Sequence, residues 1–206
     1  IIKYSSNIGA VKIGERVGAE KLHHTLRLFG FGQKTGIDSP AETSGLLMHH
    51  KHWTDIDTAA ISFGHGVSVS AVQLIAAFSA IANNGVLMRP HIVQAITDHQ
   101  GQILQQFAPQ EVRRVVSPQT AATLREILQT VMLTGGTGVH AALEGYSACG
   151  KTGTARKIDE SGTYASDRHV ASFIGFAPAE NPQVAVLVVV DEPKTQIYGG
   201  AIAAPV

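Results

Sequence analysis

The sequence predicts a single α+β domain in which helices flank an antiparallel sheet. Two apolar, β-branched runs, residues 170–176 and 184–190, are joined by residues 177–182. That link is too short for a crossover helix, so the two runs must pair antiparallel. Other segments space their apolar residues as helices do. The 206 residues are 44% hydrophobic and 16% charged, which fits one globular unit with a large core.

The predicted helices are spread over the first two thirds of the chain. Residues 7–29 have helical spacing interrupted by glycines, which predicts two short helices. Residues 30–55 are rich in Gly, Pro, Asp and Ser and predict a surface loop. Residues 70–82 are apolar nearly all round, so we expect a buried central helix that ends at Asn83-Asn84-Gly85.

A hairpin and one more helix precede the last third of the chain. Residues 92–96 and 102–107 flank a polar turn and predict a β-hairpin. Ser117-Pro118 is a typical helix start, and we expect that helix to run to about Leu133.

Charge and apolar run lengths exclude two classes of partner. Basic and acidic side chains number 16 each, whereas nucleic-acid binding usually shows as net or clustered positive charge, so no nucleic acid is expected. The longest apolar run, residues 184–190, is far below the ~20 residues that a membrane helix needs.

The single Cys149 permits no internal disulfide, and we expect it to be a small buried residue rather than a reactive thiol.

A histidine cluster, His49, His50 and His52, lies beside Trp53 and could bind a divalent metal. No Cys, Asp or Glu stands at ligand spacing within this run. We therefore expect a solvated loop there, with no metal and no cofactor.

Residues 145–152 match the G-x-x-x-x-G-K-[ST] phosphate loop, and the apolar run ending at Asp191 resembles the strand that would hold its magnesium. A phosphate-loop ATPase is therefore one alternative. That mechanism needs a strand before the loop and a helix after it. Here the residues upstream have a helical pattern and those downstream lack one, so a phosphate site is disfavoured.

The same Lys151-Thr152-Gly153 fits the K-T-G motif that accompanies S-x-x-K and an S-D-N-type triad in penicillin-binding proteins and β-lactamases. A polar loop around residues 159–162 follows it and then the apolar run from Val170, which predicts an edge strand of an antiparallel sheet for the motif. Gly153 would let another backbone approach closely. An extended peptide could pair with this edge, and Lys151, Thr152 and Thr154 would meet its terminal carboxylate.

Two further motifs have competing interpretations. Ser5-Ser6-Asn7 fits S-x-N at the start of a helix: either Ser5 or Ser6 is an ordinary N-cap, or Ser5 relays a proton while the Asn7 amide holds a substrate carbonyl. A second Lys-Thr-Gly, residues 34–36, precedes Asp38-Ser39-Pro40, which predicts a structural turn with Gly36 at positive φ.

Together these motifs resemble the transpeptidase domain of class B penicillin-binding proteins, most closely the division-specific septal type. The resemblance covers nearly the whole chain, and further landmarks in the family's order are Phe63-Gly64-His65-Gly66, Gly135-Gly136-Thr137-Gly138, Gly175-Phe176-Ala177-Pro178 and Tyr198-Gly199-Gly200. It implies a penicillin-binding/β-lactamase-like transpeptidase fold.

The resemblance also implies roles for individual residues. Ser5, Asn7, Lys151 and Thr154 would be catalytic, and Thr152, Gly153 and Thr154 would bind substrate. The backbone N–H of Thr154 would form half of the oxyanion hole. The family's nucleophile is the serine of S-x-x-K, and no serine in this chain is followed by lysine three positions later. Residues 1–206 are therefore expected to be the C-terminal portion of the domain, with the nucleophile upstream and a final helix downstream.

The implied activity is serine acyl transfer that crosslinks peptidoglycan stem peptides in septal wall synthesis. Implied partners are a stem peptide ending in D-Ala-D-Ala, β-lactam antibiotics, a membrane glycosyltransferase and other division proteins. The implied location is the periplasmic face of the inner membrane, with an N-terminal transmembrane anchor outside these residues. A D,D-carboxypeptidase and a β-lactam-sensing receptor of the same fold remain open as alternatives.

Overall fold

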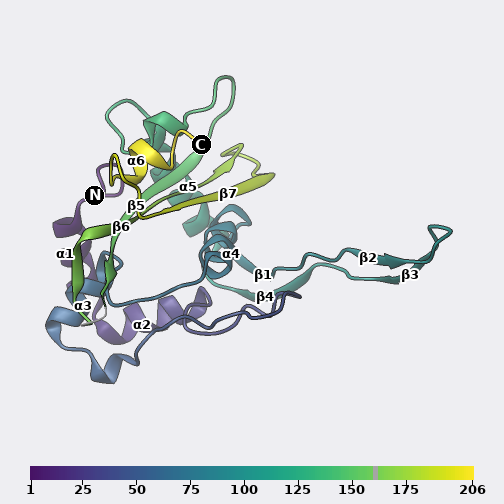
Figure 1. Ribbon diagram of the computed structural model, residues 1–206, viewed down its shortest axis with the longest axis horizontal. Helices are drawn as coiled ribbons and strands as arrows, with labels where there is room; N and C mark the ends of the chain where they lie inside the picture. Colours follow the sequence, from purple (N-terminus) through teal and green to yellow (C-terminus); the bar gives the residue numbers. More distant parts are fainter. Residues whose placement is uncertain (160–161) are drawn as a thin grey trace.

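The fold is built around a three-stranded antiparallel sheet formed by the last third of the chain (Figure 1). The computed structural model describes residues 1–159 and 162–206. The strands are β5 (Cys149–Ile158), β6 (Tyr164–Ala177) and β7 (Val184–Asp191), in the order β5-β6-β7. The predicted antiparallel pairing of the two apolar runs is confirmed, and so is the position of the lysine motif on an edge strand.

Strand β6 begins earlier than the apolar run alone predicts. Its first residues, from Tyr164, are mostly polar, but they pair with the end of β5 and so lengthen the hairpin. Residues 160–161 of the expected polar loop lie outside the described residues. Because β5 runs unbroken through Lys151 to Ile158, no helix follows the lysine, and the phosphate-loop alternative is wrong.

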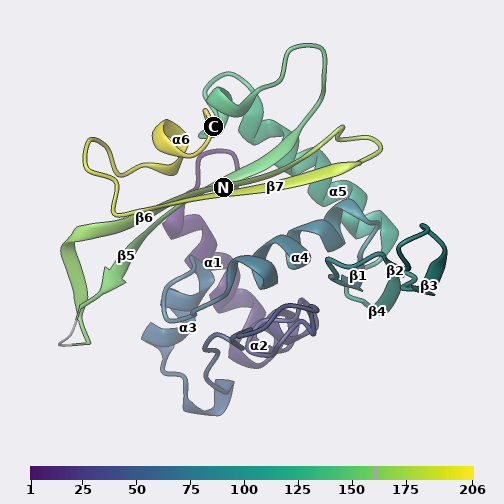
Figure 2. The same ribbon diagram turned by 45° about the vertical axis from the view of Figure 1, so that its right-hand side comes forward.

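Helices cover both faces of this sheet (Figure 2). On one face, Ile174 and Phe176 pack with Phe78 of α4 (Ala71–Ala82) and Leu128 of α5 (Pro118–Gln129). On the other face, Phe173 packs with Met132 and with Ala203 and Ala204, which follow the short helix α6 (Gly199–Ile202). Alternate residues of β6 thus point to opposite layers, as the period of two in a strand requires.

The predicted central helix and its neighbour are confirmed. Helix α4 starts with a capping box between Ser70 and Gln73, and it ends where Asn84 and Gly85 adopt positive φ. Helix α5 begins at Pro118 after the Ser117 cap, and a 3-10 turn, Thr130–Met132, continues it toward Leu133.

The N-terminal region forms two helices as predicted, α1 (Asn7–Val17) and α2 (Ala19–Leu28), separated at Gly18; a break was also expected near Gly14, but this residue lies within α1. Helix α3 (Asp55–Ser62) was not predicted, although Thr54 and Asp57 form a capping box that marks its start. Two further 3-10 turns are His50–His52 and Val139–Ala141. Within the described residues, no helix has the length and apolar character needed to cross a bilayer.

A two-stranded arm projects far from this body (Figure 1). Its outer part pairs β2 (Ala95–Thr97) with β3 (Ile103–Gln106), which confirms the predicted hairpin. Its base pairs β1 (Val86–Arg89) with β4 (Gln110–Arg114), which the sequence did not predict.

Candidate active site

A cleft of about 330 Å³ lies between the edge of β5 and the start of α1. Every residue predicted for the site lines it: Ser5, Asn7, Lys151, Thr152, Gly153 and Thr154. Segments at opposite ends of the chain are therefore brought to one place by the fold. Each motif alone is a weak sequence signal, but in the fold their hydroxyl, amide and amine groups lie in one cleft.

The two serines of the first motif have different hydrogen-bond partners. Ser6 is the N-cap of α1, because its Oγ accepts a hydrogen bond from the Gly9 N–H at 3.2 Å. Ser5 has a left-handed backbone, φ 52°, and its hydroxyl reaches Lys151 in the cleft. Ser6 therefore caps the helix, whereas the Ser5 hydroxyl faces Lys151 in the cleft.

Lys151 is the charged centre of the cleft. Its Nζ donates to Ser5 Oγ at 2.8 Å and to the carbonyl oxygen of Thr152 at 2.6 Å. Burial lowers the pKa of this amine to about 8, because a desolvated ammonium loses part of its hydration. Lys151 can therefore exchange a proton near physiological pH, which an ordinary surface lysine does not do.

The two threonines of β5 have hydrogen bonds of opposite direction. The Thr152 hydroxyl donates to Thr137 Oγ1 at 2.9 Å. The Thr154 hydroxyl accepts from the backbone N–H of Gly199 at 3.1 Å, at the start of α6. Both hydroxyls thus have protein partners before any ligand arrives.

Gly153 has close neighbours on β6 and at the start of α6. A Cβ at this position would lie 2.4 Å from the Ser172 hydroxyl of β6. Its carbonyl oxygen is in turn approached by Gly199, where an added Cβ would lie 2.4 Å from that oxygen. The backbone that comes close to Gly153 here is therefore that of α6.

An aromatic group at the cleft was missed by the sequence reasoning about site residues. Phe63 and His65 line the cleft, and the His65 ring lies 4.7 Å from that of Tyr164. The Tyr164 hydroxyl accepts from the Gly66 N–H at 3.1 Å, which ties the β5–β6 hairpin to the loop after α3. Burial, and secondarily Arg156, lowers the pKa of His65. The only signal in the sequence was the landmark Phe63-Gly64-His65-Gly66.

The second Lys-Thr-Gly is a structural turn, as predicted, with Gly36 at φ 77°. The Glu42 carboxylate accepts hydrogen bonds from the Thr35 N–H and hydroxyl and from the Gly36 N–H. Burial acts to raise the pKa of Glu42, but these hydrogen bonds outweigh it and hold the pKa below its usual value. The Thr35 and Gly36 donors of this tripeptide are therefore all bound by Glu42 within the fold.

Cys149 and the histidine cluster lie apart from this chemistry. Cys149 is fully buried, donates to the Arg125 carbonyl at 3.3 Å, and has its pKa raised to about 12 by burial, so it is a structural residue. His49 and His50 stack on each other and contact His23 of α2. No group of three or more ligating side chains within residues 1–159 and 162–206 could hold a metal ion.

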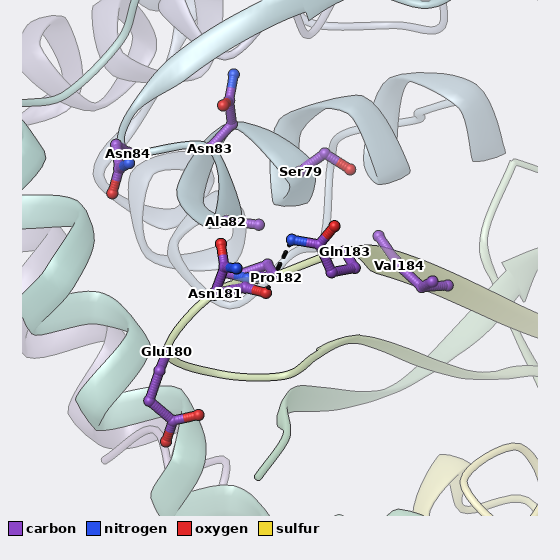
Figure 3. A pocket seen from close by; sticks show the side chains of 10 residues that line it. Ser79, Ala82, Asn83, Asn84, Glu180, Asn181, Pro182, Gln183 and Val184 are labelled. Carbon is purple, nitrogen blue, oxygen red and sulfur yellow. Dashed lines mark hydrogen bonds between the residues drawn. The ribbon is translucent and has the colours of Figure 1, made fainter. Parts of the chain in front are cut away.

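A second hollow of about 280 Å³ lies between the end of α4 and the β6–β7 link (Figure 3). Asn83, Asn181 and Gln183 line it, and Gln183 donates to the Asn181 carbonyl at 3.2 Å. Glu180 bonds to Ser147 instead of pointing into the hollow. None of the predicted site residues belongs to it, so the candidate site is the cleft beside β5.

The fold and the cleft define a class of protein that presents an open sheet edge next to a half-buried lysine and a serine. Known proteins place the chain within that class. The family described as the penicillin binding protein transpeptidase domain matches residues 1–206, and the chain belongs to this family. The class B transpeptidase domain and the fold that the motifs predicted are thereby confirmed.

Relatives and solved structures agree with this assignment. The chain is 42% identical to the stage V sporulation protein D of Bacillus subtilis, covering 100% of this chain and 32% of that protein. It is 39% identical to the probable peptidoglycan D,D-transpeptidase PenA of Neisseria gonorrhoeae, covering 100% of this chain and 33% of the relative. Penicillin-binding protein 3 of Mycobacterium tuberculosis in complex with aztreonam superposes with a TM-score of 0.90 at 36% identity, over 99% of this chain and 47% of that one. The chain thus spans about a third of the length of these curated relatives.

Proposed function

We propose that this chain is the substrate-receiving part of a peptidoglycan D,D-transpeptidase that β-lactams inhibit. The observation that carries the proposal is the Lys151–Ser5 hydrogen bond at 2.8 Å, beside the free edge of β5. Such an edge suits an extended peptide, which gains affinity from main-chain hydrogen bonds. The names of the transpeptidase relatives support the same reading.

In this proposal a stem peptide ending in D-Ala-D-Ala lies along residues 151–154. The Thr154 hydroxyl and the Lys151 ammonium attract its terminal carboxylate, and the Asn7 amide holds a carbonyl of the peptide. The Thr154 N–H donates to the oxyanion that forms during attack; one such donor is worth on the order of 10²–10³ in rate. Thr152 and Gly153 contribute the strand edge between these groups.

We further propose that the nucleophile is the serine of an S-x-x-K motif upstream in the longer protein. Its Oγ passes its proton to the lysine of the same motif and attacks the penultimate D-Ala carbonyl; an ester forms, and the bond to the last D-Ala breaks. The departing amine needs a proton. Because Lys151 donates to Ser5 Oγ, the hydroxyl proton of Ser5 is free to be passed to that amine, and the lysine ammonium replaces it. An amine of a second stem peptide then attacks the ester, releases the serine and forms the crosslink.

The biological setting is part of the same proposal. The landmarks from Ser5 to Tyr198 favour septal wall synthesis together with a membrane glycosyltransferase and other division proteins. The site of action would be the periplasmic face of the inner membrane, reached through an anchor elsewhere in the longer protein. Water as the acceptor would instead give a D,D-carboxypeptidase, and slow deacylation would give a β-lactam-sensing receptor.

A fluorescent penicillin tests the assignment of the nucleophile. Residues 1–206 alone, verified as folded by circular dichroism, should not be covalently labelled, whereas the longer protein should be. The matched control is the longer protein with the S-x-x-K serine replaced by alanine, which should lose the label. Labelling of residues 1–206 alone would contradict the proposal. Crosslinked stem-peptide dimers, as opposed to free D-Ala without dimers, separate transpeptidase from carboxypeptidase.

A further inference from the structure

Four aromatic rings meet where α2 faces the segment that leads into α3. The His23 ring of α2 lies 5.0 Å from that of His49 and 5.3 Å from that of His50, between centroids. It also stands edge-on to the Trp53 ring at 5.7 Å, and His49 and His50 stack on each other at 4.4 Å. These four residues form what we call the ring cluster. It joins α2 to the 3-10 turn before α3.

The segment that carries three of the four rings is fixed at both of its ends. Leu46 pairs with Ser68 through two backbone hydrogen bonds of 2.8 and 2.9 Å, and a capping box at Thr54 starts α3. The indole N–H of Trp53 donates to a carbonyl of the same segment at 2.9 Å. A change in the ring cluster can therefore release residues 47–53 from α2 while both ends of the segment stay in place.

The ring cluster brings together groups that acid would charge. Burial, followed by the charges of His49 and His50, holds the pKa of His23 below its usual value. Desolvation and the charge of His50 likewise lower the pKa of His49. The other charged or titratable groups that act on these two rings are also bases: Arg27 and His24 on α2, and Lys51 and His52 in the turn.

Little negative charge is available to offset these bases. The ion pairs found within residues 1–159 and 162–206 involve only Lys157 and Lys194 as cations. Glu20 is the single acidic residue of α2; it lies one turn before His23 and is exposed. The Asp57 carboxylate of α3 is already bound by Thr54. Protonation of the rings would therefore place like charges next to each other, which opposes their contact.

We propose that the ring cluster is a pH-sensitive contact, which holds residues 47–53 against α2 at neutral pH and releases them when its histidines become protonated. This inference is independent of the proposed function. The direction follows from linkage. A base whose pKa is lowered in the folded state contributes its full stability above its unfolded pKa, about 6.5 for histidine, and loses it as the pH falls from there through the folded pKa.

Hydrogen exchange of the longer protein at about pH 7.5 and about pH 5 tests the proposal. Quench-flow labelling followed by mass spectrometry measures peptides that cover residues 46–54, with correction for the intrinsic pH dependence of exchange. We expect exchange there to be on the order of 3- to 10-fold faster at the lower pH, with α2 and α3 still protected. Residues 97–103, the turn of the arm with the exposed His99, are the internal control and should not change.

Two matched variants assign the effect to the ring cluster. His23→Phe keeps an aromatic ring at the centre of the cluster but cannot take up a proton. It should keep the segment closed at both pH values and remove most of the pH dependence. His24→Phe, the same change at the next and exposed position of α2, should leave the dependence within about twofold of the unchanged protein. His50→Phe repeats the test from the other side of the contact, and circular dichroism verifies the fold of each variant.

Several results would overturn the proposal. Exchange at residues 46–54 that is the same at both pH values would do so. An acid-induced rise of equal size in His23→Phe, His50→Phe and the unchanged protein would place the sensitive group elsewhere. A rise that begins in α2 or α3 would indicate general unfolding, and loss of the effect in His24→Phe as well would assign it to the overall charge of α2. Each of these results holds whether or not penicillin acylates the longer protein.

Discussion

The tripeptide Lys-Thr-Gly occurs twice in this chain and has two different fates. At residues 151–153 it lies on an open strand edge, and its half-buried lysine donates to Ser5. At residues 34–36 it forms a turn, its lysine is exposed, and Glu42 binds the backbone and hydroxyl of the threonine. The same three residues therefore differ with their surroundings: on β5 the lysine lies in a cleft that lowers its pKa, and in the turn the threonine is bound by Glu42. The tripeptide sequence alone therefore does not predict a site; the residues around it must be considered as well.

Replacing each of the two lysines in turn tests this comparison most strongly. Lys151→Met removes the amine that bonds to Ser5 and should slow penicillin acylation of the longer protein by a factor on the order of 10²–10⁴, the range for loss of a proton-transfer group. Lys34→Met is the matched control and should leave the rate within about twofold, since the Lys34 side chain is exposed and does not line the cleft. Stopped-flow acylation measures both. Equal losses in the two variants would contradict the functional distinction between the motifs.

The dependence of the acylation rate on pH should also distinguish the two lysines. Because burial lowers the pKa of Lys151 to about 8, the ammonium that reprotonates Ser5 is lost as the pH rises through this value, and acylation should slow. Unfolding does not explain such a loss: a lysine whose pKa is lowered by folding adds stability as pH rises from its folded to its unfolded pKa. The profile is measured from pH 6 to about 10. A Lys34→Met variant should keep the same inflection, and a profile that rises through pH 8 would instead indicate that neutral Lys151 acts as a base.

A change in the turn at residues 34–36 should alter the stability of the fold and not the rate of acylation. Glu42→Gln weakens three hydrogen bonds to residues 35 and 36, and after allowance for solvent screening we expect a loss of about 1 kcal/mol, or a fall in Tm of roughly 3 °C. Glu111→Gln, at an exposed position of β4, is the control. The folded pKa of Glu42 is lowered, so this stabilisation is complete above its unfolded pKa and disappears as pH falls through the folded one. Thermal melts at neutral and acidic pH measure it; a difference from wild type that grows on acidification would argue against this role of Glu42.

The elements that the sequence predicted are those with strong local signals. The β-branched residues of β7, the caps at Ser70 and Ser117 and the glycine between α1 and α2 each act within a few residues, so their structural meaning can be read locally. The mostly polar start of β6 and the polar strand β4 at the base of the arm were missed because pairing with a partner strand, and not an apolar run, makes them strands.

The site was predictable as a set of motifs but not as a set of contacts. That Ser5 and Lys151 would meet followed from the resemblance, whereas the direction of the Thr152 hydroxyl depends on Thr137, which lies 15 positions away in a glycine-rich loop. The role of Tyr164 depends on a partner 98 positions away. Such long-range hydrogen bonds leave no periodic pattern in a sequence, since they are fixed only when the sheet and helices have packed.

The left-handed backbone of Ser5 has a consequence for how this position can vary over evolutionary time. A residue with a side chain pays about 1 kcal/mol for that conformation, and glycine would adopt it without strain. Stability alone would therefore favour glycine at position 5, whereas the hydroxyl beside Lys151 requires serine. Retention of serine at this position in related chains would thus record selection for activity against the preference of the fold, and copies that have lost catalysis should drift toward glycine there first.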